Sequence, residues 1–245
     1  MKRILASVAV LMAVIALMLR IGAERLTRLC SPSSARSGPE FKGHPWFAAT
    51  YDFVSRWSEP EFLRRFRSLV AGEATGRVLE IGVGTGANFP YYQRAGQIVA
   101  VEPDPFMLGR ARRRADRLGL EVEFQQAAAE ALPFPDASFD TVVATLVFCS
   151  VADQDRSFTE VKRVLRPGGT FRFLEHVRAD GRLVGEAPDL LTPLWQQVGA
   201  GCHLNRRTSE SIEAAGFEIE ELRQEGRSSL FPIVAGVARD RDGLP

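Results

Sequence analysis

Cysteine and histidine are scarce in this chain, and neither residue type is clustered. The 245 residues include three cysteines and three histidines. They are Cys30, Cys149 and Cys202, and His44, His176 and His203. An odd number of cysteines without a C-x-x-C pair excludes a disulfide framework and a zinc motif built on local spacing. We therefore expect no metal ion and reducing surroundings.

An excess of charge of either sign is also missing. The chain has 31 Lys and Arg against 30 Asp and Glu, a formal net charge of +1. Such a balance gives no general attraction to nucleic acid, and we expect no nucleic-acid partner. The basic stretch Gly109–Arg117 is interpreted as a solvated helix face rather than a phosphate site. A hydrophobic fraction of 45% is that of an ordinary globular protein.

One long apolar run is present, Ile4–Leu19, and it follows a basic Met-Lys-Arg start. As a helix it is roughly 24 Å long, slightly under the bilayer hydrocarbon core of about 30 Å. Counting on to Ala23 brings it close to a full span. The favoured interpretation is an uncleaved membrane anchor in residues 1–28, and a cleaved signal peptide or a buried core helix are the alternatives. We expect membrane association, with the folded domain on the cytoplasmic side, although positive charges flank the run on both sides.

The rest of the chain divides into a linker and one α/β domain. Residues 29–44 are rich in Ser, Pro and Gly, which is typical of a linker. Residues 45–245 form the predicted domain, in which strand and helix patterns alternate as in a parallel sheet covered on both faces. The strand candidates are Val78–Ile81, Ile98–Glu102, Val122–Phe124, Thr141–Thr145 and Thr170–Leu174, and the helix candidates are Pro105–Leu118 and Asp153–Leu165. Two final strands without a helix between them predict an antiparallel hairpin.

A glycine turn follows the first predicted strand, in the stretch VLEIGVGTGANF. Gly82-x-Gly84-x-x-Ala87 satisfies the dinucleotide fingerprint, so a nicotinamide cofactor is one interpretation. Glu80 lies just before the turn, where a carboxylate fits poorly beside a pyrophosphate and well beside an ammonium. Glu102 ends the next strand, where a carboxylate can accept hydrogen bonds from both hydroxyls of a ribose. A nucleoside site without a phosphate partner is therefore the second interpretation.

These features together resemble the class I S-adenosylmethionine-dependent methyltransferases, and more narrowly the methyltransferase type 11 group. The resemblance is carried by E-x-G-x-G-x-G at Glu80–Gly86, the strand-end Glu102, LPFPDASFD and VLRPGG, and it covers about Tyr51–Arg239. It implies a Rossmann-like doubly wound sheet of seven strands with a C-terminal antiparallel hairpin, preceded here by the N-terminal apolar helix. It implies S-adenosylmethionine as the cofactor.

The resemblance also assigns cofactor-binding positions. Glu80 would orient the methionine amine, and Glu102 would hold the ribose diol. The methionine and ribose portions would be lined by Gly82, Gly84, Gly86 and Asn88. The adenine would be bordered by Pro103, Asp104, Met107, Ala129, Glu130 and Leu146. One departure is Ala128, which stands where the family often has an acidic residue for the adenine amino group.

A narrower likeness is to membrane-anchored, methyltransferase-like proteins that methylate alkyl thiols. It is carried by GTGANF, TLVFCSV, EVKRVLRPGG, EHV and WQQVGAGC. It implies a small lipophilic methyl acceptor, with thiols favoured over quinones, phenols or phospholipid amines. The Asn-Pro-Pro-Tyr type box of methyltransferases acting on base amines is absent. A nicotinamide oxidoreductase and a non-catalytic nucleoside-binding module are the alternatives from other classes.

Candidates for the acceptor side lie on loops at the same sheet edge. His176, at the end of the fifth predicted strand, is a candidate general base, and a structural histidine is the alternative. Trp195 and His203 flank QQVGAGC, a stretch that either lines a substrate pocket or packs in the core. Cys149 is interpreted as a buried small hydrophobe. Tyr51 either closes over the cofactor or packs.

Overall fold

The structure is a computed structural model that describes residues 43, 45, 48, 59–179, 187–198, 201–226 and 232–241. The predicted anchor in residues 1–28 and the candidate Tyr51 lie outside these residues. Within the described ranges, we find no helix with the length and apolar character that crossing a bilayer would require.

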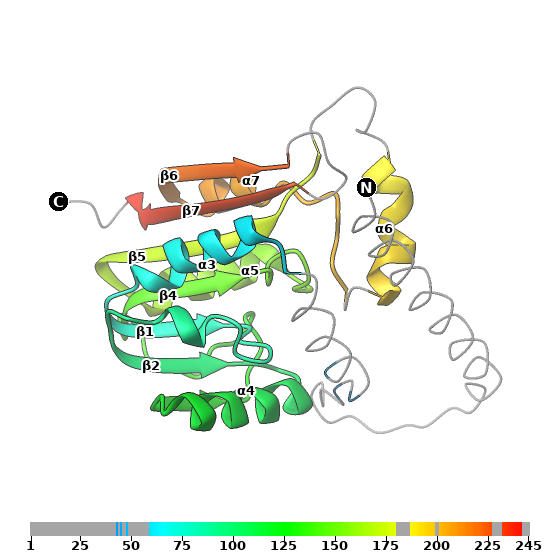
Figure 1. The fold of residues 1–245 in the computed structure, drawn as a ribbon. Helices are drawn as coiled ribbons and strands as arrows, with labels where there is room; N and C mark the ends of the chain where they lie inside the picture. Colours follow the sequence, from blue (N-terminus) through cyan, green and yellow to red (C-terminus); the bar gives the residue numbers. More distant parts are fainter. Residues whose placement is uncertain are drawn as a thin grey trace, which may run out of the picture. The chain divides into compact units, whose positions relative to one another are not determined.

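A seven-stranded sheet forms the centre of the domain, as expected (Figure 1). Its strand order is β3-β2-β1-β4-β5-β7-β6. The strands are β1 (Gly76–Ile81), β2 (Ala95–Val101), β3 (Val122–Gln125), β4 (Phe139–Thr145), β5 (Leu165–His176), β6 (Phe217–Glu225) and β7 (Ile233–Asp240). The first five strands pair in parallel, and β7 lies antiparallel between β5 and β6. The order reverses beside β1, so β1 and β4 flank the position where α/β sheets bind ligands.

Helices cover both faces of this sheet, and each face has its own apolar core. On one face, α3 (Glu61–Gly72) and α4 (Pro105–Leu118) contribute buried side chains such as Phe66, Leu108 and Ala111. On the other face, α5 (Gln154–Val164) and α7 (Thr208–Ala214) contribute residues such as Phe158 and Ile212. Coverage on both faces explains why the central strands β1 and β4 bury successive side chains on both sides of the sheet.

The helix α4, which follows β2, begins and ends where local chemistry requires. Asp104 caps its first turn by accepting hydrogen bonds from the backbone N–H groups of Phe106 and Met107, at 2.8 and 3.3 Å. Pro105 occupies the first helical position, where no N–H is needed. Gly119 ends the helix in the left-handed conformation, with φ of 64°. The bounds Pro105–Leu118 agree with those predicted from the sequence.

Two elements differ from the sequence prediction. Strand β5 begins at Leu165, directly after α5, and includes the Arg-Pro-Gly-Gly segment, whose composition is typical of a turn. Leu165 pairs with Phe139 of β4, which extends both strands toward their starts. The helix α6 (Ala187–Val198) was not predicted, because Pro188 and Pro193 interrupt its helical pattern.

Candidate cofactor and acceptor sites at the carboxyl edge of the sheet

The glycine turn between β1 and the short 3-10 helix η1 (Phe89–Tyr91) needs glycine at two positions for space as well as for conformation. Gly82 and Gly86 have φ of 62° and 80°, values that side chains disfavour. A Cβ added to Gly82 would lie 2.6 Å from a methyl of Val147, and one added to Gly86 would lie 2.5 Å from the ring of Phe89. The turn therefore packs against the loop after β4, to which Val147 belongs.

Glu102 holds this turn against the start of α4. Its carboxylate accepts the backbone N–H of Gly84 at 2.9 Å and that of Asp104 at 3.0 Å. Burial raises the pKa of Glu102 to about 7, although both hydrogen bonds oppose the shift. The carboxylate thus lies just after β2 and beside the turn, in the place where the sequence predicts a partner for ribose hydroxyls.

Glu80 is the centre of a buried polar network behind the turn. Its carboxylate accepts hydrogen bonds from the amide of Asn88 and the hydroxyl of Tyr92, both at 2.9 Å. Asn88 also donates to the hydroxyl of Thr145 at 2.7 Å and accepts from the Arg67 guanidinium at 2.8 Å. Burial raises the pKa of Glu80 to about 7. Asn88 is therefore placed to fix Glu80, whatever else it contacts.

Sequence reasoning missed Arg67 and Tyr92 as members of this network. Arg67 lies on α3, ahead of the glycine turn, and its guanidinium also pairs with Glu59 at 2.6 Å. Tyr92 lies just after η1. Neither residue stands in a recognisable motif, and a buried arginine on a charged helix has no distinct sequence signal. The only hint is that a buried carboxylate such as Glu80 requires partners.

Five of the six predicted adenine-bordering residues fall into two groups. Pro103, Asp104 and Met107 lie at the start of α4, and the methyl of Met107 would lie 3.6 Å from a Cβ built on Gly84. Ala129 and Glu130 lie in the loop after β3. Ala129 is buried in the core, whereas the Glu130 carboxylate accepts the backbone N–H groups of Ala152 and Asp153, at 2.8 and 3.4 Å. Glu130 thus ties two loops of the same edge together.

Leu146 adopts a left-handed backbone conformation, which is uncommon for a residue with a side chain. Its φ is 59°, and its N–H donates to the carbonyl of Leu174 at 2.7 Å. Such strain persists where the surroundings impose it, and it is concentrated at functional sites. The turn at Leu146 redirects the chain from β4 into the loop that carries Val147 and Cys149.

A buried carboxylate on β5 holds that loop in place. Glu175 is fully buried, and its two oxygens accept the backbone N–H groups of Val147, Phe148 and Cys149, at 2.8, 3.0 and 3.2 Å. Burial raises the pKa of Glu175 to about 7 against these three bonds. Because all three of these donors are backbone N–H groups of consecutive residues in one loop, Glu175 acts as a positioning group for that loop.

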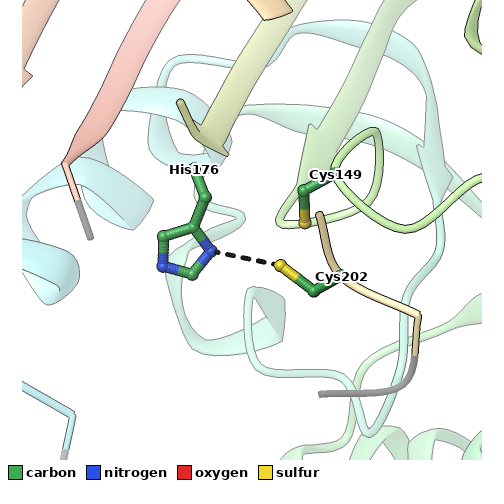
Figure 2. A group of neighbouring side chains, drawn as sticks. All are labelled: Cys149, His176 and Cys202. Carbon is green, nitrogen blue, oxygen red and sulfur yellow. Dashed lines mark hydrogen bonds between the residues drawn. The ribbon is translucent and has the colours of Figure 1, made fainter. Parts of the chain in front are cut away.

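The acceptor side of the edge brings together two cysteines and a histidine from separate segments. Cys149, His176 and Cys202 offer sulfur and nitrogen atoms that all lie within 4.8 Å of one another. Figure 2 shows the three side chains converging, with Nδ1 of His176 4.0 Å from Sγ of Cys202. Cys149 is buried, as predicted, but it has two reactive neighbours. No sequence pattern indicated this group, because the three residues are far apart in the chain.

The remaining acceptor-side candidates surround this group. His203 approaches the carbonyl oxygen of Cys149 through both Nδ1, at 3.1 Å, and its backbone N–H, at 2.8 Å. Trp195 of α6 packs against Cys149 and Cys202. A hydrogen bond from Cys149, together with contacts to His176 and Trp195, lowers the pKa of the Cys202 thiol below its ordinary value. The Cys149 thiol, as the buried donor, has its pKa raised.

The carboxyl edge of the sheet therefore has two parts. One part is the glycine turn with the buried carboxylates of Glu80 and Glu102, and the other is the group of two cysteines and a histidine. The carboxylates beside the turn suit the ammonium and ribose of a sulfonium nucleoside and would repel a pyrophosphate. A family model described as a methyltransferase domain matches residues 79–173. The crystal structure of a SAM-dependent methyltransferase from Aquifex aeolicus superposes with a TM-score of 0.56 at 21% identity, over 80% of this chain and 98% of that one. This likeness supports the fold.

Curated relatives narrow the comparison. Human thiol S-methyltransferase TMT1B is 35% identical over 71% of this chain and 73% of its own length. Human thiol S-methyltransferase TMT1A is 40% identical over 60% of this chain, and the match spans 62% of TMT1A, somewhat less than two thirds. A bacterial phosphatidylethanolamine N-methyltransferase and demethylmenaquinone methyltransferases match over shorter stretches.

The chain belongs to the S-adenosylmethionine-dependent methyltransferases of the type 11 group, the family that includes these thiol S-methyltransferases. Its cofactor is S-adenosylmethionine, so the comparison decides against the nicotinamide alternative.

Proposed function

We propose that this protein transfers the methyl group of S-adenosylmethionine to a small lipophilic thiol. The observation that carries the proposal is the identity with thiol S-methyltransferases, which reaches beyond the cofactor motifs to 73% of one relative's length. A second observation supports it. The acceptor side of the sheet edge has a small apolar, sulfur-containing cluster, in which Cys149, Cys202 and Leu204 are buried beside Trp195. In addition, no Asn-Pro-Pro-Tyr type box follows β4 in the sequence.

The reaction requires alignment more than activation. The acceptor attacks a methyl carbon that positive sulfur already activates, and positioning of the two reactants can supply roughly 7–11 kcal/mol of the barrier. A thiol with a pKa of about 8.5 is partly ionised near neutral pH, so it needs less help from a base than an amine or a phenol.

Each part of the edge has a proposed role in this reaction. Gly82, Gly84 and Gly86 let the backbone approach the nucleoside, Glu102 holds the ribose diol, and Glu80 orients the methionine amine with Asn88 fixing its carboxylate. For the adenine, we propose the same bordering residues that the family resemblance implies. We propose that His176 acts on the acceptor side of the edge, together with Cys149 and Cys202.

A panel of matched acceptors tests the proposal. The full chain is supplied with S-adenosylmethionine carrying an isotope-labelled methyl group and with 1-hexanethiol, 1-hexanol, hexylamine or a phenol. We expect labelled methyl hexyl sulfide, detected by mass spectrometry, and little product from the other three. Label on hexylamine or on the phenol, without thioether, would instead support the phospholipid-amine or quinone alternative.

We further propose that residues 1–28 anchor the protein to a membrane, with the catalytic domain on the cytoplasmic side. The support is the apolar run Ile4–Leu19, and a lipophilic acceptor concentrates in lipid. Fractionation of cells expressing the full chain should place it in the membrane pellet, and deletion of Met1–Arg28 should release it. A deletion variant that still pellets with membranes would overturn this assignment.

A further inference from the structure

The group formed by Cys149, His176 and Cys202 has no assigned role in cofactor binding. Cys149 follows β4, His176 ends β5 and Cys202 follows α6, so three separate segments deliver one donor atom each to a common point (Figure 2). Both thiols are nearly inaccessible, with exposed fractions of 2% and 6% for the two cysteines. Cysteine is often buried as a small hydrophobe, but an imidazole beside two buried thiols is a polar group that requires a partner.

The donor atoms suit a soft metal ion in both chemistry and spacing. Zinc prefers thiolate and imidazole ligands at about 2.3 and 2.0–2.1 Å in tetrahedral geometry, which places neighbouring donors about 3.5–3.8 Å apart. Here Sγ of Cys202 and Nδ1 of His176 are 4.0 Å apart, and no pair in the group exceeds 4.8 Å. Small side-chain rotations would therefore bring all three atoms into coordination distance.

The charges of such a site also match its burial. Two thiolates and a neutral imidazole around a divalent cation have no net charge, so the desolvation cost of burying each ion separately is avoided. A disulfide between the cysteines would use only two of the three donors. It would also leave His176 without a thiolate neighbour.

The surrounding hydrogen bonds hold the loops of the two cysteines in place before any ligand binds. Glu175 accepts the N–H of Cys149 and of the two residues before it, and Arg206 donates to the carbonyls of Phe148 and Val151, at 2.5 and 2.7 Å. The N–H of His203 donates to the Cys149 carbonyl, which joins the two cysteine loops. Preorganisation by outer hydrogen bonds is typical of metal sites.

We propose that Cys149, His176 and Cys202 bind a zinc ion whose fourth coordination position takes the sulfur of the acceptor thiol. Among the described residues, these three form the one group of His, Cys, Asp or Glu side chains with three ligand atoms close enough to hold a metal ion. Three protein ligands with an open position are the pattern of catalytic rather than structural zinc sites. The assignment departs from the sequence expectation of no metal, and its second half rests on the proposed thiol methyltransferase function.

The chemistry of the step balances without an oxidant or a reductant. The acceptor's S–H bond breaks as its sulfur binds zinc, and the proton leaves to solvent, since a coordinating thiol is deprotonated outright. The sulfur then forms a bond to the methyl carbon of S-adenosylmethionine while the bond between that carbon and the sulfonium breaks. The products are a methyl thioether and S-adenosylhomocysteine, whose sulfur is neutral, and zinc keeps its oxidation state.

Metal analysis of the full chain tests the site without relying on activity. Protein purified under reducing conditions should contain about one zinc per chain. After removal by a chelator, titration with Co²⁺ should restore the metal and produce sulfur-to-cobalt charge-transfer absorption. Addition of 1-hexanethiol should then shift the cobalt bands. The variant Cys202→Ser should lose at least about tenfold in zinc affinity, whereas the matched Cys30→Ser, at the cysteine outside the group, should not.

Several outcomes would overturn the inference. Reduced wild-type protein that binds neither zinc nor cobalt would do so, as would metal binding that Cys202→Ser leaves unchanged. A Cys149–Cys202 disulfide in metal-free, fully active protein would replace the metal site with a redox pair. S-adenosylhomocysteine binding by Cys202→Ser shows that the variant folds.

The metal site and the proposed function fail in different ways. Thiol methylation at the same rate by zinc-free protein would leave the proposed function standing and overturn the binding of the acceptor sulfur by zinc. Zinc binding by a protein that methylates only amines or phenols would leave the metal site standing and overturn the proposed function, together with the role given to the fourth position.

Discussion

The two halves of the sheet's carboxyl edge are built in different ways. In the cofactor half, the glycine turn, Glu80 and Glu102 come from the first two strands and their loops, within one continuous segment of the chain. In the acceptor half, Cys149, His176 and Cys202 come from three segments far apart in the chain. The first half can be predicted from local sequence, because one turn and two strand ends make most of it. The second half exists only once the whole sheet has formed.

Substitution of Glu102 in the cofactor half should cause the largest loss of nucleoside affinity. Glu102→Ala removes the carboxylate that holds the glycine turn and that we assign to the ribose diol. Hydrogen bonds to a charged group are worth about 1.5–3 kcal/mol each, so loss of two should weaken S-adenosylhomocysteine binding about 100-fold or more. Calorimetric titration measures this change. Glu123→Ala, at an exposed carboxylate on β3, is the control, and equal affinities in the two variants would remove Glu102 from the site.

A second comparison separates backbone strain from close packing at the glycine turn. Gly82→Ala and Gly119→Ala both place a side chain at φ near +60°, but only the first meets another residue, Val147, at 2.6 Å. Each should lose about 1–2 kcal/mol of stability from the left-handed conformation. Thermal denaturation measures that loss. Gly82→Ala alone should also weaken nucleoside binding, about tenfold, and an equal loss in Gly119→Ala would contradict the role of the turn.

The pH dependence of cofactor binding gives a third test. Burial raises the pKa values of Glu80 and Glu102 to about 7 in the protein without cofactor. Both groups should bind the nucleoside as carboxylates, so binding releases protons below pH 7. Affinity should therefore strengthen from pH 6 to pH 7, by at most about tenfold per pH unit for each group, and level off above that.

The substitution Glu80→Gln should remove part of this slope. Because the amide does not titrate, the variant should keep only the contribution from Glu102. Isothermal titration of S-adenosylhomocysteine at several pH values measures both slopes. An affinity in the wild type that falls as pH rises from 6 to 7 would have the wrong sign for this account.

Substitution of the two helix caps Asp104 and Asp153 should change stability and nucleoside affinity least. Asp104 caps α4 beside the cofactor and Asp153 caps α5, where its carboxylate accepts the N–H of Arg156 at 3.0 Å. Either substitution by alanine should cost about 1 kcal/mol of stability, measured by chemical denaturation. Asp104→Ala should also weaken nucleoside binding by a few fold, because loss of the cap loosens the backbone whose N–H at residue 104 donates to Glu102. An equal change in binding from Asp153→Ala would show that the effect is not local.

The fold and the position of the glycine turn could be predicted from the sequence for a definable reason. Alternating strands and helices, a terminal hairpin and a glycine turn flanked by two acidic residues are all local patterns. The α4 bounds followed from a capping Asp104 and a terminal Gly119, which act within one turn. The structure confirms the seven-stranded sheet and the terminal hairpin.

What the sequence did not predict depends on long-range contacts. Arg67 donates a hydrogen bond to Asn88, and Tyr92 donates one to Glu80. No residue spacing in the sequence predicts either contact. The role of Glu175 is likewise visible only in the fold, where the loop after β4 occupies both of its carboxylate oxygens. In the sequence, Cys149 and Cys202 are isolated cysteines, and only the fold shows that both lie beside His176.

If the cofactor half and the acceptor half of the edge act separately, one paired measurement should distinguish their variants. S-adenosylhomocysteine affinity and 1-hexanethiol methylation are measured side by side for Glu102→Ala, Cys202→Ser and the wild type. We expect Glu102→Ala to lose both S-adenosylhomocysteine affinity and thiol turnover. We expect Cys202→Ser to keep wild-type S-adenosylhomocysteine affinity but to lose thiol turnover. Unchanged thiol turnover in Cys202→Ser, or a loss of nucleoside affinity as large as that of Glu102→Ala, would contradict this separation.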